Sequence, residues 1–186
     1  MCQRSLSHFR NDWHWMSTFL HDITHEFQRH KLLADRAMAN LSDADFIRRP
    51  AEHVNPIALI VKHLAGNLAS RWSDFLTTDG DKPSRDRDAE FVLAATDART
   101  SLMSAWETGW SALFKTLAEL SDLDLAKTVT IRGEPHTVQQ ALLRGLDHAA
   151  YHIGQILYVA RWSNPDAQWL TIAPGRSREH KAAYLK

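Results

Sequence analysis

Apolar residues recur every three or four positions over four long stretches of this chain, and polar residues fill most positions between them. Such spacing gathers the apolar side chains on one face of an α-helix. We therefore expect helices over residues 15–40, 56–76, 89–120 and 137–162. In the third stretch the apolar face is marked by Leu102, Trp106, Trp110, Leu113 and Leu117.

Residue types at the start of two stretches support these helices. Asn55 is a favoured N-cap residue, and Pro56 suits the first position of a helix. Thr137 and Gln140 have the spacing of a capping box, in which each side chain bonds the backbone N–H of the other residue.

The connections predict how the helices are arranged. The polar segment TTDGDKPSRDRD, residues 77–88, separates the second and third helices. Extended, it spans ~40 Å, the length of a helix of ~26 residues, so it can cross the bundle and leave these two helices parallel. Residues with β propensity flank Arg132 and Gly133 and predict a small two-stranded ribbon. The expected fold is all-α, a four-helix bundle with a long crossover between helices two and three and a β-ribbon between helices three and four.

Length and charge set the broad class of the protein. The chain has 186 residues, with 22 Lys or Arg and 22 Asp or Glu. This length favours a single domain over residues 1–186, with residues 1–14 as a flexible extension and residues 163–186 as an irregular tail. Trp169, Leu170 and Ile172 of the tail are expected to dock on the bundle. The balanced charge argues against nucleic acid as a partner.

Cysteine and hydrophobic content narrow the possibilities further. Cys2 is the only cysteine, which excludes a disulfide within the chain and cysteine-based metal sites. The first residues lack the apolar run of a secretory signal, and no segment of ~18 apolar residues is present to span a membrane. We therefore expect a cytoplasmic protein with no membrane partner.

The candidate chemistry lies in the fourth predicted helix. His148 and His152 are four residues apart, so both imidazoles project from one helix face and can bind a single transition-metal ion. Both lie at the edge of the apolar stripe of that helix. The alternative is a pair of boundary histidines that only hydrogen-bond their neighbours.

The other histidines lie in patterns that favour other roles. His21 and His25 share the four-residue spacing but lie opposite the apolar face of the first helix, so we expect them at the surface. His30 lies on the apolar stripe and is expected to be a hydrogen-bonded core histidine. His63 shares its face of the second helix with small or polar residues, and periodicity alone leaves open whether that face is solvated or lines a polar interior. The remaining histidines lie near ends, loops or the ribbon: His8, His14, His53, His136 and His180.

Three stretches resemble one known family of proteins. VKHLAGNLASRWSDFLTTDGDKPSRDRDAEF, TIRGEPHTV and DHAAYHIGQI are similar to the DinB-like superfamily of metal-binding helical bundles, and to a subgroup of uncharacterised function within it. The similarity extends over residues 27–169. It implies an up-down-down-up bundle, often a homodimer, in which one histidine of helix two and an HxxxH pair of helix four hold a metal ion. On this chain these are His63, His148 and His152.

The resemblance also implies a kind of chemistry. Members of the superfamily include metal-dependent transferases and an isomerase that use low-molecular-weight thiols such as bacillithiol or mycothiol. Three neutral imidazoles leave a coordination position open on Zn, Ni or Fe, as in catalytic sites. Asn67, one turn after His63, is a candidate for orienting a bound group, whereas Glu134 and Asp147 have no established direction.

Three functions therefore stand open. The first is a metal-dependent transferase that takes a small-molecule substrate, a low-molecular-weight thiol. The second is a metal-dependent hydrolase. The third is a non-catalytic metal-binding bundle that serves in a stress response or an interaction.

Overall fold

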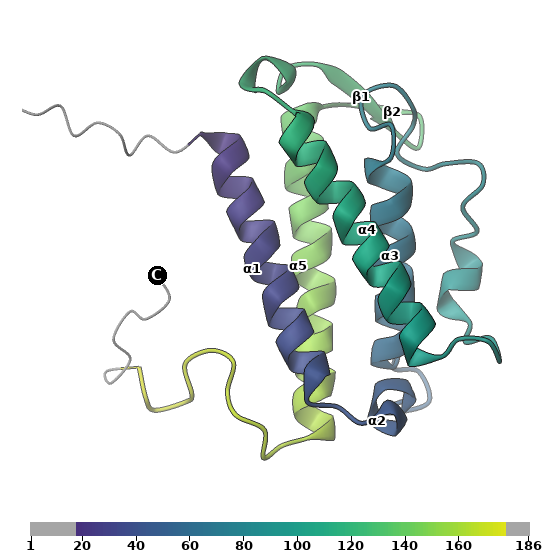
Figure 1. The fold of residues 1–186 in the computed structure, drawn as a ribbon, viewed down its shortest axis with the longest axis vertical. Helices are drawn as coiled ribbons and strands as arrows, with labels where there is room; N and C mark the ends of the chain where they lie inside the picture. Colours follow the sequence, from purple (N-terminus) through teal and green to yellow (C-terminus); the bar gives the residue numbers. More distant parts are fainter. Residues whose placement is uncertain (1–17, 178–186) are drawn as a thin grey trace, which may run out of the picture.

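Four long helices lie side by side in the computed structural model, which describes residues 18–177 (Figure 1). They are α1 (Phe19–Ala39), α3 (Ile57–Trp72), α4 (Arg99–Glu119) and α5 (Val138–Ser163). Short elements join them: the helix α2 (Asp43–Ile47), the 3-10 turns η1 (Asp88–Phe91) and η2 (Asp122–Asp124), and the strands β1 (Thr128–Ile131) and β2 (Glu134–Thr137). The prediction of an all-α bundle with a small ribbon is confirmed.

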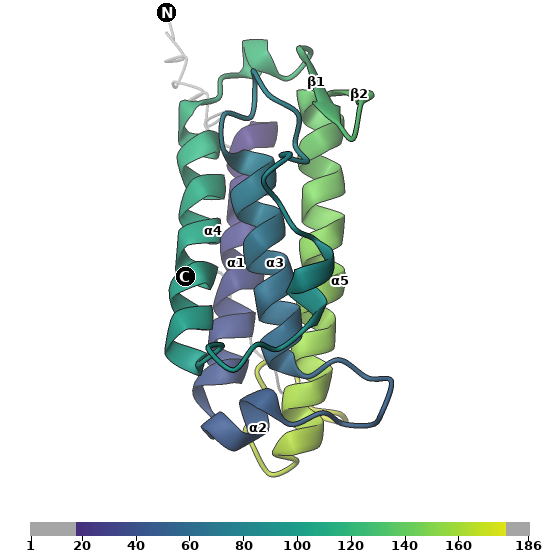
Figure 2. The ribbon, with the colours of Figure 1, turned by 90° about the vertical axis from the view of Figure 1, so that its right-hand side faces the viewer.

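The direction of the helices confirms the predicted crossover. Helices α3 and α4 both run from the α2 end of the bundle to the ribbon end, while α1 and α5 run the opposite way (Figure 2). The connection over residues 73–98 returns along the outside of α3 and carries η1 (Figure 2). It is thus longer than the predicted polar segment of residues 77–88.

Large apolar side chains fill the centre between the helices. The ring of Phe27 meets the rings of Trp72 and Trp110 edge to face, with centroids 6.3 Å apart in each pair. Trp106 is also fully buried, and its indole N–H donates to Asp35 over 2.9 Å. These tryptophans are packing residues, as their helical spacing indicates.

The ribbon follows from its two-residue turn. Strands β1 and β2 pair antiparallel, and Arg132 and Gly133 join them with φ of 56° and 75°. Positive φ at both positions is typical of the type I′ turn, whose twist matches that of the strands. The carboxylate of Asp79 accepts the backbone N–H groups of Arg132 and Gly133, so the α3–α4 connection is tied to the ribbon.

The start of α4 differs from the prediction. The helix was expected from residue 89, but it begins at Arg99. The carboxylate of Asp97 accepts the backbone N–H of Ala94 and the ammonium of Lys62, which holds a turn immediately before the helix. Residues 88–91 form η1 instead, because the side chain of Glu90 is directed to partners on and beside α3.

Smaller differences concern the other helix ends. Helix α3 ends at Trp72 rather than at residue 76, and Asp74 after it has a φ of 49°. Pro56, not Asn55, takes the N-cap position of α3. The short helix α2 was not predicted. The capping box of Thr137 and Gln140 is confirmed at the start of α5.

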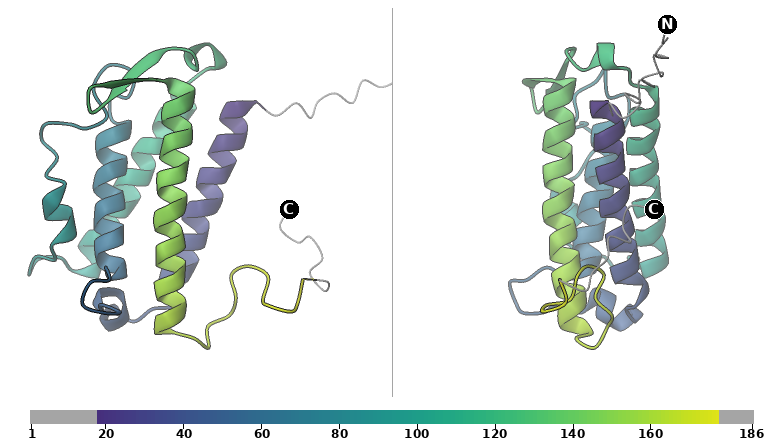
Figure 3. Two further views of the ribbon diagram at one scale, coloured as in Figure 1. Left: turned by 180° about the vertical axis from the view of Figure 1, so that it is seen from behind. Right: turned by 90° about the vertical axis from the view of Figure 1, so that its left-hand side faces the viewer.

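The first helix and the C-terminal tail agree with the prediction only in part. Helix α1 begins at Phe19, after the cap Thr18, and the predicted residues 15–17 lie outside the described residues, as do residues 1–14. In the tail, Leu170 packs on the core, whereas Trp169 and Ile172 remain 46% and 43% exposed. The tail extends from the end of α5 and residues 178–186 lie outside the described part (Figure 3).

Within residues 18–177, no helix has the length and apolar character needed to span a bilayer.

Candidate metal centre

Helix α3 is buried on nearly all sides, and this places His63 inside the protein. The helix lies between α4 on one side and α5 and η1 on the other. His63 is 3% exposed, and Leu59, Asn67 and Ser70 on the same face are also buried. The face that periodicity could not place therefore lines the interior.

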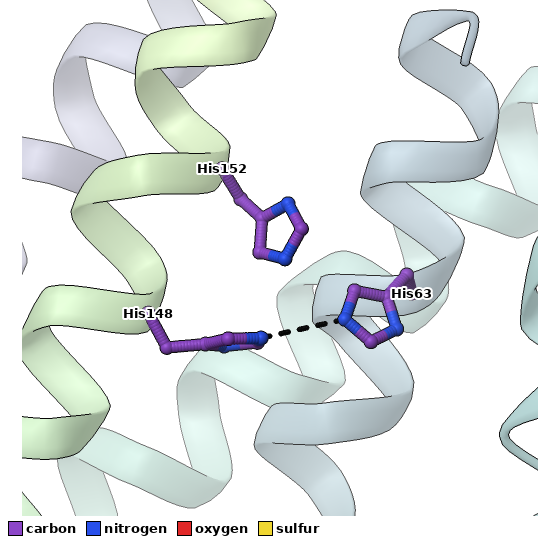
Figure 4. Close-up of side chains that lie close together, drawn as sticks. All are labelled: His63, His148 and His152. Carbon is purple, nitrogen blue, oxygen red and sulfur yellow. Dashed lines mark hydrogen bonds between the residues drawn. The ribbon is translucent and has the colours of Figure 1, made fainter. Parts of the chain in front are cut away.

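The three predicted histidines converge between α3 and α5 (Figure 4). The Nε2 atoms of His63 and His148 are 3.4 Å apart. The ring of His152 lies 4.8 Å from that of His63 and 4.6 Å from that of His148, measured between centroids. One ligand atom from each residue lies within 4.8 Å of the others, and no other group of this kind is found within residues 18–177.

The other described histidines take no part in this cluster. His21 and His25 are exposed on α1, as predicted. His30 is half-buried, and its Nδ1 donates to the carbonyl of Glu26 over 2.7 Å. His136 accepts a hydrogen bond from Arg144 at the ribbon. His53 is exposed, while His8, His14 and His180 lie outside the described residues.

Glu90 contacts the histidine cluster although the sequence did not predict it there. Its Oε2 atom is 2.8 Å from His63 Nδ1, and its carboxylate also accepts two hydrogen bonds of 2.8 Å from Arg85. A carboxylate behind a metal-binding histidine fixes the ring and raises its basicity. Gly66, one turn along α3, makes room for it, because a Cβ there would lie 2.8 Å from the Glu90 carboxyl carbon.

Hydrogen bonds define the proton positions on two of the rings. The Glu90 carboxylate is ionised and only accepts, so the proton of His63 is on Nδ1 and the lone pair is on Nε2. The Nδ1 of His152 lies 2.9 Å from the Gln155 carbonyl oxygen, which likewise leaves the lone pair of His152 on Nε2. The Nε2 atoms of His63 and His152 are therefore the ring nitrogens with a lone pair for a metal ion.

Burial favours the neutral form of two histidines of the cluster. It lowers the pKa of His148 to about 3, and the charges of neighbouring groups, including His152 and His63, act in the same direction. Burial also lowers the pKa of His152 to about 4, against the opposing hydrogen bond to Gln155. Burial alone would raise the pKa of Glu90, but its bonds to His63 and Arg85 hold it below the usual value. At neutral pH, His148 and His152 thus need not lose a proton to bind a metal ion.

The nitrogen spacing fits a transition-metal ion. A tetrahedral ion with bonds of about 2.0–2.1 Å to imidazole holds two ligand nitrogens about 3.3 Å apart. The 3.4 Å between His63 and His148 is close to this spacing. Three nitrogen donors without a thiolate suit Zn, Ni or Fe, and they leave further coordination positions unused.

The histidine cluster is covered by Phe91 on one side and is more exposed on the side of α5. The ring of Phe91 lies against that of His63, with centroids 4.6 Å apart. His148 is only half-buried, and Tyr151, whose ring lies 4.2 Å from that of His152, is 57% exposed. The α5 side is therefore the more exposed side of the cluster.

The other three residues considered in the sequence, Asn67, Asp147 and Glu134, lie in different surroundings. Asn67 is buried one turn after His63, and its side chain forms no hydrogen bond with any residue that the structure describes. Asp147 is exposed on α5. Glu134 is exposed as well and lies 3.8 Å from Arg144, so neither carboxylate joins the histidines.

Comparison with known proteins agrees with this fold. Residues 14–176 match the family model described as "Protein of unknown function (DUF1572)". The chain is similar to the crystal structure of a conserved protein from Enterococcus faecalis, with a TM-score of 0.59 and 17% identity, over 78% of this chain and 96% of that chain. At that identity the likeness shows the fold alone. No curated protein matches the chain. Because the family model spans most of its length, the chain belongs to the DUF1572 family.

Proposed function

We propose that this protein is a metal-dependent enzyme of the DinB-like kind, in which His63, His148 and His152 bind one divalent ion of Zn, Ni or Fe. The observation that carries the proposal is the convergence of three imidazoles from two helices, with the Nε2 atoms of His63 and His148 3.4 Å apart. When bound, such an ion acts as a Lewis acid that favours the thiolate form of a thiol or lowers the pKa of a water.

The protein's own groups prepare this site. Glu90 holds the ring of His63 by its Nδ1 and leaves Nε2 directed at His148. Burial keeps His148 and His152 unprotonated at neutral pH. Phe91 covers one side of the His63 ring, and His148, which is only half-buried, is the ligand nearest to solvent.

A transferase that uses a low-molecular-weight thiol is the reaction we favour. Three nitrogen ligands and an accessible side are typical of catalytic sites, whereas structural zinc sites have four protein ligands. The apolar core is also complete without an ion, since Phe27, Trp72 and Trp110 fill the bundle centre. The thiol and a homodimeric assembly are predictions drawn from the family resemblance.

Metal analysis of protein purified without a nickel column tests the proposal. After growth with Zn, Ni and Fe, we expect close to one metal ion per chain, and we expect His148→Ala to lose it during purification because the two remaining imidazoles bind an ion much more weakly than three. His25→Ala is the matched control, since His25 is an exposed histidine with the same four-residue spacing on α1. Metal content below ~0.2 per chain in the unmodified protein would remove the proposal.

Activity and stability then separate the enzyme from a metal-binding bundle without a reaction. The metal-loaded protein is assayed with bacillithiol, mycothiol or glutathione and a chromogenic electrophile. A catalytic ion should leave the metal-free protein largely folded, whereas a structural ion should raise the melting temperature strongly. Large metal-dependent stabilisation without turnover would favour the non-catalytic reading, and turnover of esters in the absence of thiol would favour a hydrolase.

A further inference from the structure

Arg71, in the last turn of α3, is a buried arginine whose guanidinium is only partly satisfied by residues 18–177. It is 8% exposed, and its Nε and Nη1 atoms have no hydrogen-bond partner within the described residues. A buried guanidinium with unused N–H groups is costly, because the interior replaces none of the bonds it made with water. Arg85 shows the ordinary solution, with its guanidinium forming two hydrogen bonds to Glu90.

Arg71 lies on the same side of α3 as the metal centre. His63, Asn67 and Arg71 follow one another at intervals of four residues, which places them on one helix face. On α5, Arg144 precedes His148 by the same interval. Helices α3 and α5 are antiparallel (Figure 2). Because Arg71 follows His63 and Arg144 precedes His148, both arginines lie on the ribbon side of the histidine cluster.

The electrostatics agree with this placement. The charge of Arg71 is among the causes of the low pKa of His148. Burial, together with the neighbouring cations Arg144, Arg85 and Arg132, lowers the pKa of Arg71 to about 10, against the opposing charge of Asp81. The nearby acid is Asp81, which already pairs with Arg85 at 3.4 Å and Arg132 at 3.1 Å. Arg85 and Arg144 also have carboxylate partners, Glu90 and Glu134, so Arg71 is the arginine of this group for which no ion pair is found within residues 18–177.

Two further features support a ligand-binding site around Arg71. The Cγ of Arg71 lies beside Gly80, 3.6 Å from where a Cβ would be, so the α3–α4 connection packs against the arginine stem. Between Arg71 and His63, the buried Asn67 has a side-chain amide without a hydrogen bond to the described residues. Guanidinium and amide N–H groups together are donors for an oxyanion.

We propose that Arg71, assisted by Asn67, binds the carboxylate of a small substrate whose other end reaches the three-histidine centre. The inference rests on the proposed function, because it supplies the second point at which that substrate is held. The substrate class is a short thiol that carries a carboxylate. A guanidinium holds a carboxylate through two parallel hydrogen bonds, and this fixes the direction of the molecule as well as its affinity.

The test compares two thiols that differ in the carboxylate. The protein is loaded with Co²⁺, and its visible absorption spectrum is titrated with 3-mercaptopropionate and with 2-mercaptoethanol. We expect 3-mercaptopropionate to bind at least ~10-fold more tightly, because one charge-assisted bidentate contact is worth about that much or more. In Arg71→Met this preference should disappear, while the affinity for 2-mercaptoethanol stays within ~2-fold.

Control variants separate a specific contact from a general charge effect. Methionine keeps most of the arginine stem, so the variant should fold, and circular dichroism checks this. Arg29→Met removes an exposed charge on α1 and should leave both affinities unchanged. Arg71→Lys keeps the charge without the planar fork and should retain part of the preference. Equal binding of the two thiols by the unmodified protein, or equal weakening of both by Arg71→Met, would overturn the inference.

A metal-free measurement makes the two proposals distinguishable. The Nε–H resonance of Arg71 is followed by ¹⁵N NMR while propionate is added at constant ionic strength. A saturable shift that is absent in Arg71→Met supports the anion site even if the protein binds no metal ion. No shift in the unmodified protein, or stronger competition by inorganic phosphate than by propionate, contradicts a carboxylate site.

Discussion

The two buried faces of α3 differ in chemistry although both are shielded from water. The face toward α4 is apolar and packs so closely that Gly109 of α4 lies against the backbone of α3 at Ala65. The face toward α5 carries His63, Asn67 and Arg71, which are 3%, 6% and 8% exposed. Apolar burial of the first kind stabilises the fold, whereas buried polar groups cost free energy unless they are paired. We infer that the first face maintains the bundle and the second is kept for binding.

The α4 face should be the most sensitive to added volume. A Cβ at Gly109 would lie 2.8 Å from the Ala65 carbonyl oxygen and 3.1 Å from Leu68 Cβ. We expect Gly109→Val to lower the free energy of unfolding by about 3 kcal/mol or more, because neither helix backbone can move freely. Urea unfolding measures this change.

Gly154 provides the matched control for that substitution. It is in the interior of α5, and a Cβ there would meet nothing within 4 Å. Gly154→Ala should raise the free energy of unfolding by up to ~1 kcal/mol through helix propensity. If Gly109→Val were as well tolerated as Gly154→Ala, the close approach of α3 and α4 would be wrong.

On the polar face, the largest effect should follow from Glu90→Gln. The amide cannot match the charge of the carboxylate that holds His63 Nδ1 and Arg85. We expect metal affinity to fall by roughly 10–100-fold, as is usual when the hydrogen-bond partner of a ligand histidine is removed. Competition with a chromogenic chelator measures it. Glu107→Gln, which alters an exposed ion pair with Lys31, should leave the affinity unchanged, and an equal loss in both variants would argue against a role for Glu90.

The fold was largely predictable from local signals, and its errors have local causes. The apolar period located four helices, and Thr137 with Gln140 marked the start of α5 because a capping box depends only on neighbouring residues. The start of α4 was wrong because residues 89–98 continue a pattern compatible with a helix. Tertiary partners decide their structure instead: Glu90 bonds His63, and Asp97 bonds Lys62.

The candidate site was predictable to a smaller extent. His148 and His152 could be found by spacing, but His63 could not, because α3 is buried on several sides and its periodicity gives no single inward direction. The family resemblance supplied His63. Glu90 could not be predicted from the sequence, because the connection between α3 and α4 contains several acids, among them Asp79, Asp81 and Asp86. Only the folded structure shows which acid contacts His63. Nothing in the sequence distinguishes Arg71 from the other cations near helix ends, because its burial depends on how the helices pack.

A moderate effect of opposite sign is expected for Arg71→Met in the metal-free protein. The unpaired guanidinium is buried at a cost that methionine does not have. We expect the free energy of unfolding to rise by about 1–2 kcal/mol, because an unsatisfied buried polar group costs about that much. Chemical unfolding without ligand gives the value. A loss of stability would instead show that Arg71 supports the fold, and the contrast between the two faces of α3 would weaken.

The smallest effect concerns the connection that carries Glu90 to the polar face. Asp79 fastens this connection to the ribbon, and the backbone N–H groups of Gly133, Asp81 and Arg132 lower its pKa to about 2. A carboxyl pKa that is lower in the folded protein stabilises it above the unfolded value of ~3.9, and the contribution is lost as the pH falls from about 4 to about 2. Because solvent screens this group, we expect only a few tenths of a kcal/mol. The difference in unfolding free energy between the unmodified protein and Asp79→Asn, measured from pH 6 to pH 2, should shrink over that interval. A difference that stays constant with pH would mean that the charge of Asp79 does not hold the connection in place.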